Sequence, residues 1–218
     1  MLITARYLVD RLRQPRTRAD ELLELRRRLI HEPGPQDVAV ARGADPGATN
    51  QATGEERRLA EELAVLRVET SRAIGAVGSC SGCSRGHAWP EGQWHGGFCC
   101  SSPTEVVFTD HEVAALRLSG TRPGDLRPPR SDHAGCAMRG PTGCSLPPRH
   151  RPTVCVRYFC GELRRELARR GDLLALQERL DRMEDVFDAF VAARSRRMER
   201  RALAELHPDL PDLPLMAE

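Results

Sequence analysis

The pattern of apolar positions along the chain predicts two long helices. One series recurs at intervals of four and three residues and comprises Leu59, Leu63, Leu66, Thr70, Ala73 and Val77. A second series has the same spacing and comprises Leu173, Leu176, Leu180, Met183, Phe187 and Phe190. This spacing places each series along one side of a helix, as in a coiled-coil seam. Gly171-Asp172 is a candidate break before the second series, in a helix expected from about Cys160 to Leu206.

Shorter elements are also predicted. Residues 18–31 form an amphipathic helix with Leu22, Leu25 and Leu29 on one face, and the Pro-, Gly- and Ala-rich residues 32–53 form a linker. Two capping-box patterns, Thr53 with Glu56 and Thr109 with Glu112, mark helix starts. Residues 105–108 (Glu-Val-Val-Phe) are expected to be a short strand.

These elements divide the chain into five parts. An N-terminal helix with its linker is followed by a helical arm, a cysteine-rich domain, a second helical arm and a proline-containing disordered tail. The expected bounds are 1–52, 53–79, 80–162, 163–206 and 207–218. The predicted fold class is mainly α, with long helices flanking a small, irregular, metal-stabilised cysteine-rich core.

The cysteine-rich part carries the candidate chemistry. All eight cysteines of the chain lie in it: Cys80, Cys83, Cys99, Cys100, Cys136, Cys144, Cys155 and Cys160. Five of the seven histidines lie there too: His87, His95, His111, His133 and His150. Thiolate and imidazole are preferred ligands of zinc and iron, so the segment is expected to bind metal through these cysteines. Because it is poor in large apolar residues, it needs a staple to fold, either metal or disulfides, and metal is favoured if the thiols are reduced.

Charge and hydropathy limit the expected cellular location and the expected classes of binding partner. The net charge is +2 and the 33 basic residues are all arginines, interspersed with acidic ones, which argues against nucleic acid as a partner. Short arginine runs at 26–28, 196–197 and 200–201 are interpreted as solvated helix faces. Neither a signal peptide nor a membrane-spanning run is recognisable, so we expect a cytoplasmic protein with reduced thiols and no membrane contact.

Spacing alone leaves the ligand set open. Eight cysteines permit two four-ligand sites, or one such site with spare thiols. The adjacent pair Cys99-Cys100 either serves two sites or supplies one ligand and one free thiol. Cys160 is expected at the start of a helix, where an anion is favoured, which suits a thiolate ligand or a reactive thiol. Arg151-Pro152 is expected either to neutralise thiolates or to hold the loop before Cys155.

Several stretches of the cysteine-rich part form a combined pattern: Cys80-Ser-Gly-Cys83, Gly97-Phe98-Cys99-Cys100, 109–113, Cys136, 142–146 and 151–160. Together they resemble the YkgJ family of cysteine-cluster proteins, which is described as zinc- or iron-chelating. They fall within about residues 78–162. In this chain 15 residues separate Cys83 from Cys99, more than the family usually has, which makes His87 and His95 candidate replacement ligands. The resemblance implies zinc or iron as the cofactor, including a 4Fe–4S cluster.

The expected function is a metal-binding cysteine-cluster protein that acts as a structural or interaction scaffold. Flagellin lysine N-methylases of the FliB type carry a related cluster, so an iron–sulfur-dependent protein-modifying enzyme, or an accessory to one, is the first alternative. A zinc-dependent nucleic-acid binder is the second. The helical arms are expected to emerge together from the metal core and to pack antiparallel on each other; the alternative is that they bind a protein partner or a second copy.

Overall fold

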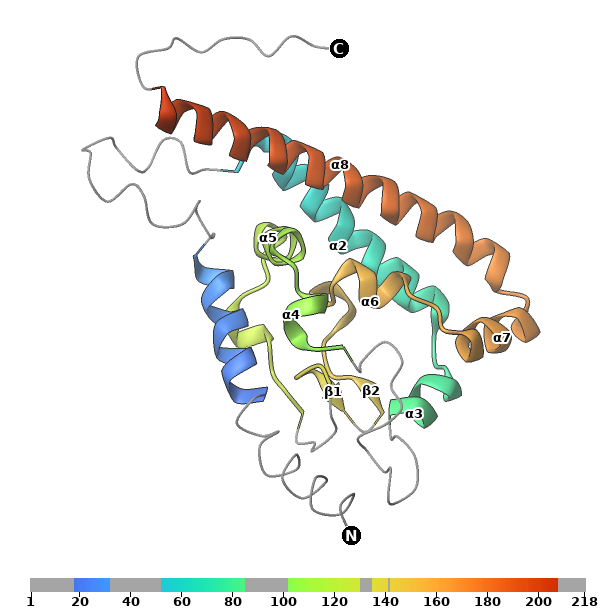
Figure 1. The fold of residues 1–218 in the computed structure, drawn as a ribbon. Coiled ribbons are helices and arrows are strands. Elements are labelled where there is room, and N and C mark those ends of the chain that lie inside the picture. The colour runs from blue at the N-terminus through green and yellow to red at the C-terminus, as the bar shows by residue number, and fades with distance from the viewer. Residues whose placement is uncertain (1–17, 32–51, 85–101, 130–134, 141, 208–218) are drawn as a thin grey trace, which may run out of the picture.

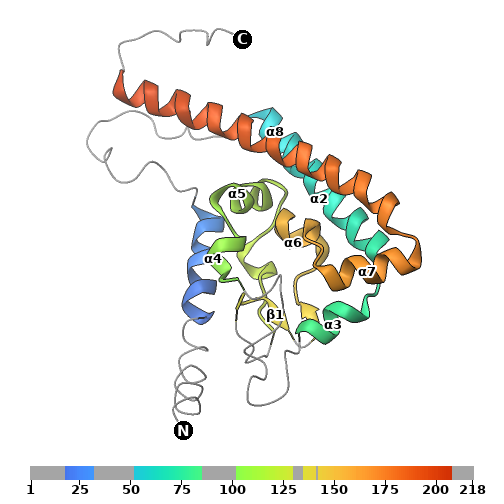
Figure 2. The same ribbon diagram turned by 45° about the vertical axis from the view of Figure 1, so that its right-hand side comes forward.

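A computed structural model describes residues 18–31, 52–84, 102–129, 135–140 and 142–207. The chain is mainly helical, as expected, and the two views in Figures 1 and 2 show a long helical pair above a group of short elements. A helix at residues 18–30 comes first. The other elements are α2 (Gly54–Ile74), α3 (Gly78–Ser84), α4 (Thr104–Val107), α5 (Asp110–Leu118), η2 (Pro123–Asp125), β1 (Arg139–Gly140), β2 (Gly143–Cys144), η3 (Pro148–His150), α6 (Thr153–Arg157), α7 (Gly161–Arg170) and α8 (Leu173–Leu206).

The long helices α2 and α8 form an antiparallel hairpin, which confirms the expected intramolecular packing (Figure 1). Three ion pairs give its direction, since they join Glu55 to Arg196, Glu62 to Arg182 and Glu69 to Arg179. Part of each predicted seam lies in this contact, while Leu176 and Leu180 belong to a cluster with residues of α7. The buried members of the two seams are Leu59, Leu63, Leu66, Thr70, Leu176, Leu180, Met183 and Phe190.

The α2 seam ends earlier than the sequence pattern predicts. The helix stops at Ile74, and Gly75 follows with φ +64°, a left-handed value that favours glycine. Ala73 is exposed, and Val77 belongs to the connection that leads into α3. The expected break in the last helix is confirmed, because Gly171 (φ +77°) caps α7 and separates it from α8.

The N-terminal helix docks through its arginines as well as through its leucines. Leu22, Leu25 and Leu29 are buried, as the pattern predicts. Arg26 and Arg28 each donate a 2.8 Å hydrogen bond to a backbone carbonyl, of Leu126 and Phe108 respectively. The interpretation of this arginine run as a solvated face is therefore wrong for these two residues.

The strand expected over 105–108 is also wrong, because these residues belong to the helical turn α4 and its end. The turn brings Thr104 and Val107 to the same buried side. The Thr104 hydroxyl donates to Glu21 and accepts the N–H of Ala137. These tertiary contacts outweigh the β-propensity of the Val-Val pair.

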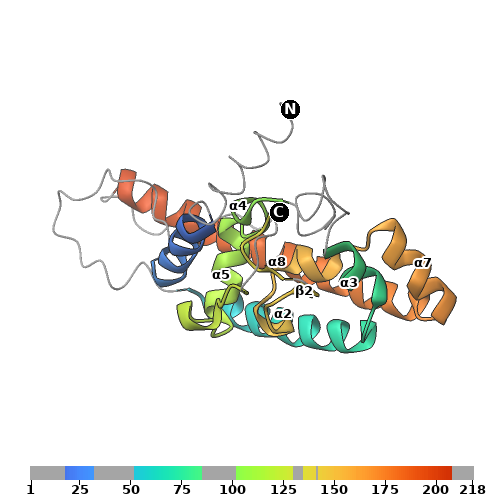
Figure 3. The ribbon, with the colours of Figure 1, turned by 90° about the horizontal axis from the view of Figure 1, so that it is seen from below.

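Three clusters of buried side chains hold the elements together. The sheet-side core joins the N-terminal helix, α4 and α5 to the segment 136–146. The hairpin core joins α2 and α8 to α5 and α6. The α7 core joins α7 to the start of α8, the end of α2 and α3. Seen from below in Figure 3, α3, β2 and α7 lie beside one another on one part of the molecule.

Candidate metal centre

One cavity gathers all six of the cysteines that the structure describes. It has a volume of about 400 Å³ and lies among α3, the β1–β2 hairpin, α6 and the start of α7. The cysteines on its wall are Cys80, Cys83, Cys136, Cys144, Cys155 and Cys160. Cys99 and Cys100 lie outside the described residues. The fold therefore brings the first and the last cysteines of the segment to one place.

The α7 side of the cavity carries three of these cysteines. Cys80 and Cys83 lie on α3 at i and i+3, so they share a helix face. Cys160 is the N-cap of α7, where its Sγ accepts the N–H of Leu163 at 3.5 Å. This confirms the expected position of Cys160 at a helix start. Cys80 and Cys160 both pack against the α7 core.

The sheet side carries the other three. Cys136 precedes β1, Cys144 lies in β2 opposite Arg139 of β1, and Cys155 lies in α6. All three belong to or pack against the sheet-side core. Burial raises the pKa of the Cys136 thiol to about 11, so this group stays protonated at neutral pH unless a cation or metal stabilises its thiolate.

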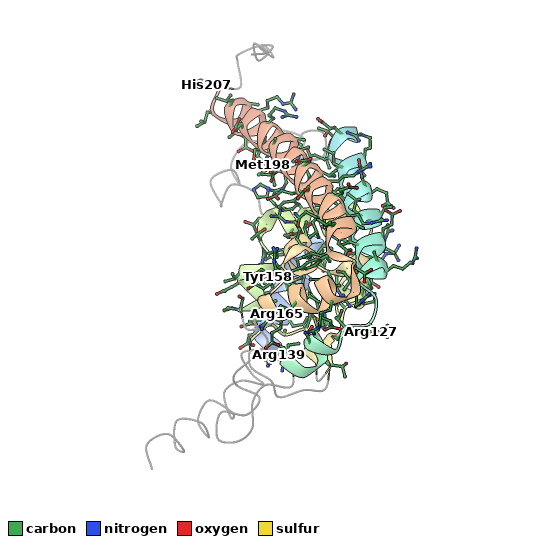
Figure 4. The ribbon with its side chains drawn as sticks, turned by 90° about the vertical axis from the view of Figure 1, so that its right-hand side faces the viewer. Arg127, Arg139, Tyr158, Arg165, Met198 and His207 are labelled. Atoms are coloured by element: carbon green, nitrogen blue, oxygen red, sulfur yellow. The ribbon has the colours of Figure 1, made fainter. Side chains whose placement is uncertain are left out.

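The charges on the cavity wall are positive. Arg139 and Arg151 line it, and none of the described lining residues carries a carboxylate. Arg139 has 0 % of its surface exposed. Arg151 donates its Nε–H to the Leu146 carbonyl at 2.8 Å, which fixes the loop before Cys155. Figure 4 labels Arg139 and Tyr158 of this wall, well away from His207 at the far end of α8.

The rest of the wall is mainly apolar. Buried side chains on it include Phe108, Met138, Leu146, Phe159 and Leu163. A wall of this kind lowers the local dielectric constant, which strengthens the interaction between a thiolate and a guanidinium. The cavity is therefore suited to an anionic, sulfur-ligated group.

A buried glutamate supports the helix that carries Cys155. Glu112 on α5 accepts the Val154 N–H at 3.2 Å and the Thr153 hydroxyl at 3.1 Å, both at the start of α6. Arg67 on α2 donates to Thr153 Oγ1 at 2.9 Å and pairs with Glu112 at 3.3 Å. We call these four residues the Glu112 clamp. Burial raises the pKa of Glu112 and lowers that of Arg67, while each charge partly offsets the effect on the other.

This finding refines the predicted capping box at Thr109. The Thr109 hydroxyl accepts the Glu112 N–H at 3.3 Å, as the pattern predicts. The Glu112 carboxylate is instead committed to α6 and to Arg67. Two stretches of the sequence that carry the family resemblance, 109–113 and 151–160, thus contact each other through this side chain.

A second glutamate supports the helix that carries Cys80 and Cys83. Glu166 on α7 accepts the Gly78 N–H at 3.0 Å and the Ser79 N–H at 2.9 Å, one with each carboxylate oxygen. We call these three residues the Glu166 clamp. The neighbouring Ser79 hydroxyl and the two N–H groups lower the pKa of Glu166, although the hydroxyl lies outside hydrogen-bond geometry. Glu166 is partly exposed.

The histidines that the structure describes in this segment are not on the cavity wall. His111 contacts Arg194 at 3.3 Å, and His150 contacts Thr121 at 2.9 Å. His87, His95 and His133 lie outside the described residues.

The cavity does not present a preformed metal geometry within the part of the chain that is described. No three His, Cys, Asp or Glu side chains among those residues are grouped closely enough to hold an ion. The residue types suit a thiolate-bound metal, and about four of the side chains would have to converge further to bind one.

Three residues that support the cavity were not identified from the sequence: Arg67, Arg139 and Glu166. Arg67 lies four residues after Leu63 on the buried face of α2, and this charged residue at a seam spacing was an available signal. Arg139 and Glu166 carried no such signal, because only the tertiary fold brings them to the cavity and to α3.

Comparison of the chain with family models, with curated proteins and with solved structures found no match. The likeness to the YkgJ family therefore rests on the sequence stretches described above. Among the described helices, none combines the length and the apolar character required to cross a bilayer.

Proposed function

We propose that this chain is a metal-binding cysteine-cluster protein that holds zinc or iron, the latter as an ion or as an iron–sulfur cluster. The observation that supports the proposal most directly is the gathering of six cysteines, from both ends of the cysteine-rich segment, around one cavity. The proposed ligand pool is all eight cysteines, with Cys99 and Cys100 included on the basis of the sequence.

Electrostatics favour a thiolate-ligated metal at this position. Four thiolates around a divalent ion leave a net charge of about −2, and iron–sulfur clusters with four cysteine ligands are also anionic. Arg139 and Arg151 supply two compensating positive charges on the cavity wall. Arg139 is fully buried, so its charge acts with little solvent screening.

The proposed role of the metal is structural. Cys80 and Cys160 on the α7 side and the three cysteines of the sheet side pack against different hydrophobic cores. A metal shared between the two sides would join these cores and fix the end of the α2–α8 hairpin that lies next to α7. The hairpin would then serve as the scaffold that meets a partner.

Metal content and the visible spectrum of the full-length chain, purified without oxygen, test the proposal. Stoichiometric zinc in a colourless protein would support a structural site. Iron with sulfide and broad visible absorption would support a cluster and make redox chemistry the next question. Absence of both metals would contradict the proposal.

A substitution tests the sheet-side ligands. We expect Cys155→Ser to lose bound metal and to melt at a lower temperature, because metal binding and folding are coupled. Tyr158→Phe is the matched control, since Tyr158 lines the same cavity from the end of the same helix and carries no thiol. If Cys155→Ser keeps full metal content and the parental melting temperature, Cys155 is not a ligand.

A further inference from the structure

The helix that carries the Cys-x-x-Cys pair is held from outside itself. α3 has seven residues, with the sequence Gly-Ser-Cys-Ser-Gly-Cys-Ser. Glycine and serine are poor helix formers, and so short a helix is unstable in isolation. The positions of Cys80 and Cys83 therefore depend on the contacts that α3 makes with the rest of the molecule.

One face of α7 provides part of these contacts, and β2 also lies against α3. Glu166 binds the first two N–H groups of α3, at Gly78 and Ser79. One turn later, Arg170 donates to the Ala76 carbonyl at 3.3 Å and is itself paired with Asp172 at 2.7 Å. The three backbone groups lie within four residues of Cys80, so α7 fixes both the position and the direction in which α3 starts.

The same helix begins with a cysteine. Cys160 caps α7, and Glu166 lies six residues further along. The glutamate therefore joins the element that carries Cys80 and Cys83 to the element that carries Cys160. Two-point binding by one carboxylate also limits rotation of α3, which a single hydrogen bond would not.

We propose that Glu166 is a positioning residue for the cysteine site, which sets the metal affinity by orienting Cys80 and Cys83 toward Cys160. The inference rests on the proposed metal-binding function. It does not require Glu166 to touch the metal, because the carboxylate is occupied by the two backbone N–H groups. Groups that hydrogen-bond to a metal ligand itself change metal affinity by about 10- to 100-fold when they are removed. Glu166 acts on the backbone next to the ligands, so we expect an effect near the lower end of that range.

The test compares Glu166→Ala with Glu162→Ala in the full-length chain. Glu162 lies on the exposed surface of the first turn of α7, so its replacement controls for effects on the helix itself. The affinity for Zn²⁺ is measured by competition with a chelator of known strength. We expect Glu166→Ala to weaken binding by about 10-fold or more, and Glu162→Ala to leave it near the parental value.

Glu166→Gln should have a Zn²⁺ affinity between those of the parent and Glu166→Ala. It also keeps the inference testable if the alanine variant folds poorly. The amide oxygen can still accept one of the two N–H bonds, whereas the amide nitrogen cannot accept the other. A loss of affinity smaller than that of Glu166→Ala is expected. An affinity equal to that of the parent in both variants would overturn the inference.

Melting of the metal-free chain separates a positioning role from a merely structural one. In the metal-free chain we expect Glu166→Ala to lower the melting temperature a little, because two hydrogen bonds are lost. With Zn²⁺ bound we expect a clearly larger drop relative to Glu162→Ala. An equal drop for Glu166→Ala with and without Zn²⁺ would overturn the inference. If the parent itself binds no metal, the proposed function fails; if the parent binds Zn²⁺ and Glu166→Ala matches it, only this inference fails.

Discussion

The Glu112 clamp and the Glu166 clamp use the same arrangement in two different environments. In each, a short helix carries at least one cysteine to the cavity, and a glutamate from another helix binds its first turn. Glu112 accepts one N–H and one hydroxyl, whereas Glu166 accepts two N–H groups. Glu112 is 3 % exposed and has Arg67 as a buried counter-ion, whereas Glu166 is partly exposed and relies on backbone N–H groups. The environment, more than the hydrogen bonds, distinguishes them.

The difference indicates how each side of the cavity responds to change. A buried carboxylate needs its partners, because an uncompensated charge in the interior is costly. A carboxylate near solvent can exchange its partners for water at small cost. We therefore expect the sheet side, held by the Glu112 clamp, to be a fixed frame, and the α7 side, held by the Glu166 clamp, to adjust when a metal binds.

The largest expected effect follows from removing the buried counter-ion. Arg67→Met keeps much of the side-chain volume and leaves Glu112 without a charge partner. We expect the free energy of unfolding to fall by about 3–5 kcal/mol, measured by urea denaturation. Arg182→Met is the control, since Arg182 is 67 % exposed in its pair with Glu62, and its loss should cost about 0–1 kcal/mol.

The double variant Arg67→Met, Glu112→Gln refines this test. It removes both charges, so it should recover part of the stability that Arg67→Met loses. A loss below about 1 kcal/mol for Arg67→Met alone would mean that Glu112 is already protonated in the folded chain. The contrast between the two clamps would then concern hydrogen bonding alone.

The second largest expected effect is a difference in alkylation rate between cysteine thiols on the two sides of the cavity. Burial raises the pKa of Cys136 from 9.0 to about 11, which leaves about one-hundredth of the thiolate that an unperturbed group would have. In the reduced, chelator-treated chain we expect iodoacetamide to alkylate Cys136 about 100-fold more slowly than it alkylates Cys136 in urea-unfolded chain, as followed by peptide mass spectrometry.

Cys80 and Cys83 provide the reference on the α7 side, because both are only partly buried. They should be alkylated before Cys136. Equal rates for all three cysteines would show that the sheet side opens as readily as the α7 side, and the idea of a fixed frame would fail.

The sequence predicted the helical framework well because that framework depends on local spacing. The α2 seam as far as Thr70, the α8 seam from Leu176 to Phe190, the caps at Thr53 and Thr109 and the break at Gly171 are confirmed. Each is specified by residues within a few positions of one another, and the seams are long enough to average out exceptions. The strand expected at 105–108 failed because Thr104 is held by distant partners in a segment only four residues long.

Only part of the candidate site could be predicted from local sequence patterns. The cysteines could be identified as candidate ligands from their residue type, and six of them line the cavity. Glu112 was recognised as a helix cap, whereas its contacts with Arg67 and Thr153 link residues far apart in the sequence. Glu166 is one of two acidic residues on the arginine-rich α7. No local pattern separates it from Glu162, and only the position of α3 gives it a role.

The smallest expected effect is a pH dependence of stability, which should have opposite signs for Glu166 and Glu112. An unfolded glutamate titrates near pH 4.3. The lowered pKa of Glu166 means that its carboxylate stabilises the fold above about pH 4.3 and that this contribution is lost as the pH falls through the lowered value. The raised pKa of Glu112 has the opposite sign, since its ionisation opposes folding increasingly as the pH rises from about 4.3 through the raised value.

Glutamine variants isolate the contribution of each carboxylate to the pH dependence of stability, because glutamine does not titrate. The free energy of unfolding of the metal-free, reduced chain is measured in urea between about pH 3.5 and pH 7 for the parent, Glu112→Gln and Glu166→Gln. The advantage of the parent over Glu166→Gln should grow with pH, and its advantage over Glu112→Gln should shrink. The unpaired Arg67 left in Glu112→Gln adds an offset that does not vary over this range, because arginine stays charged. Slopes of the same sign would mean that Arg67 outweighs burial at Glu112, and the two clamps would then be electrostatically equivalent despite their different depths.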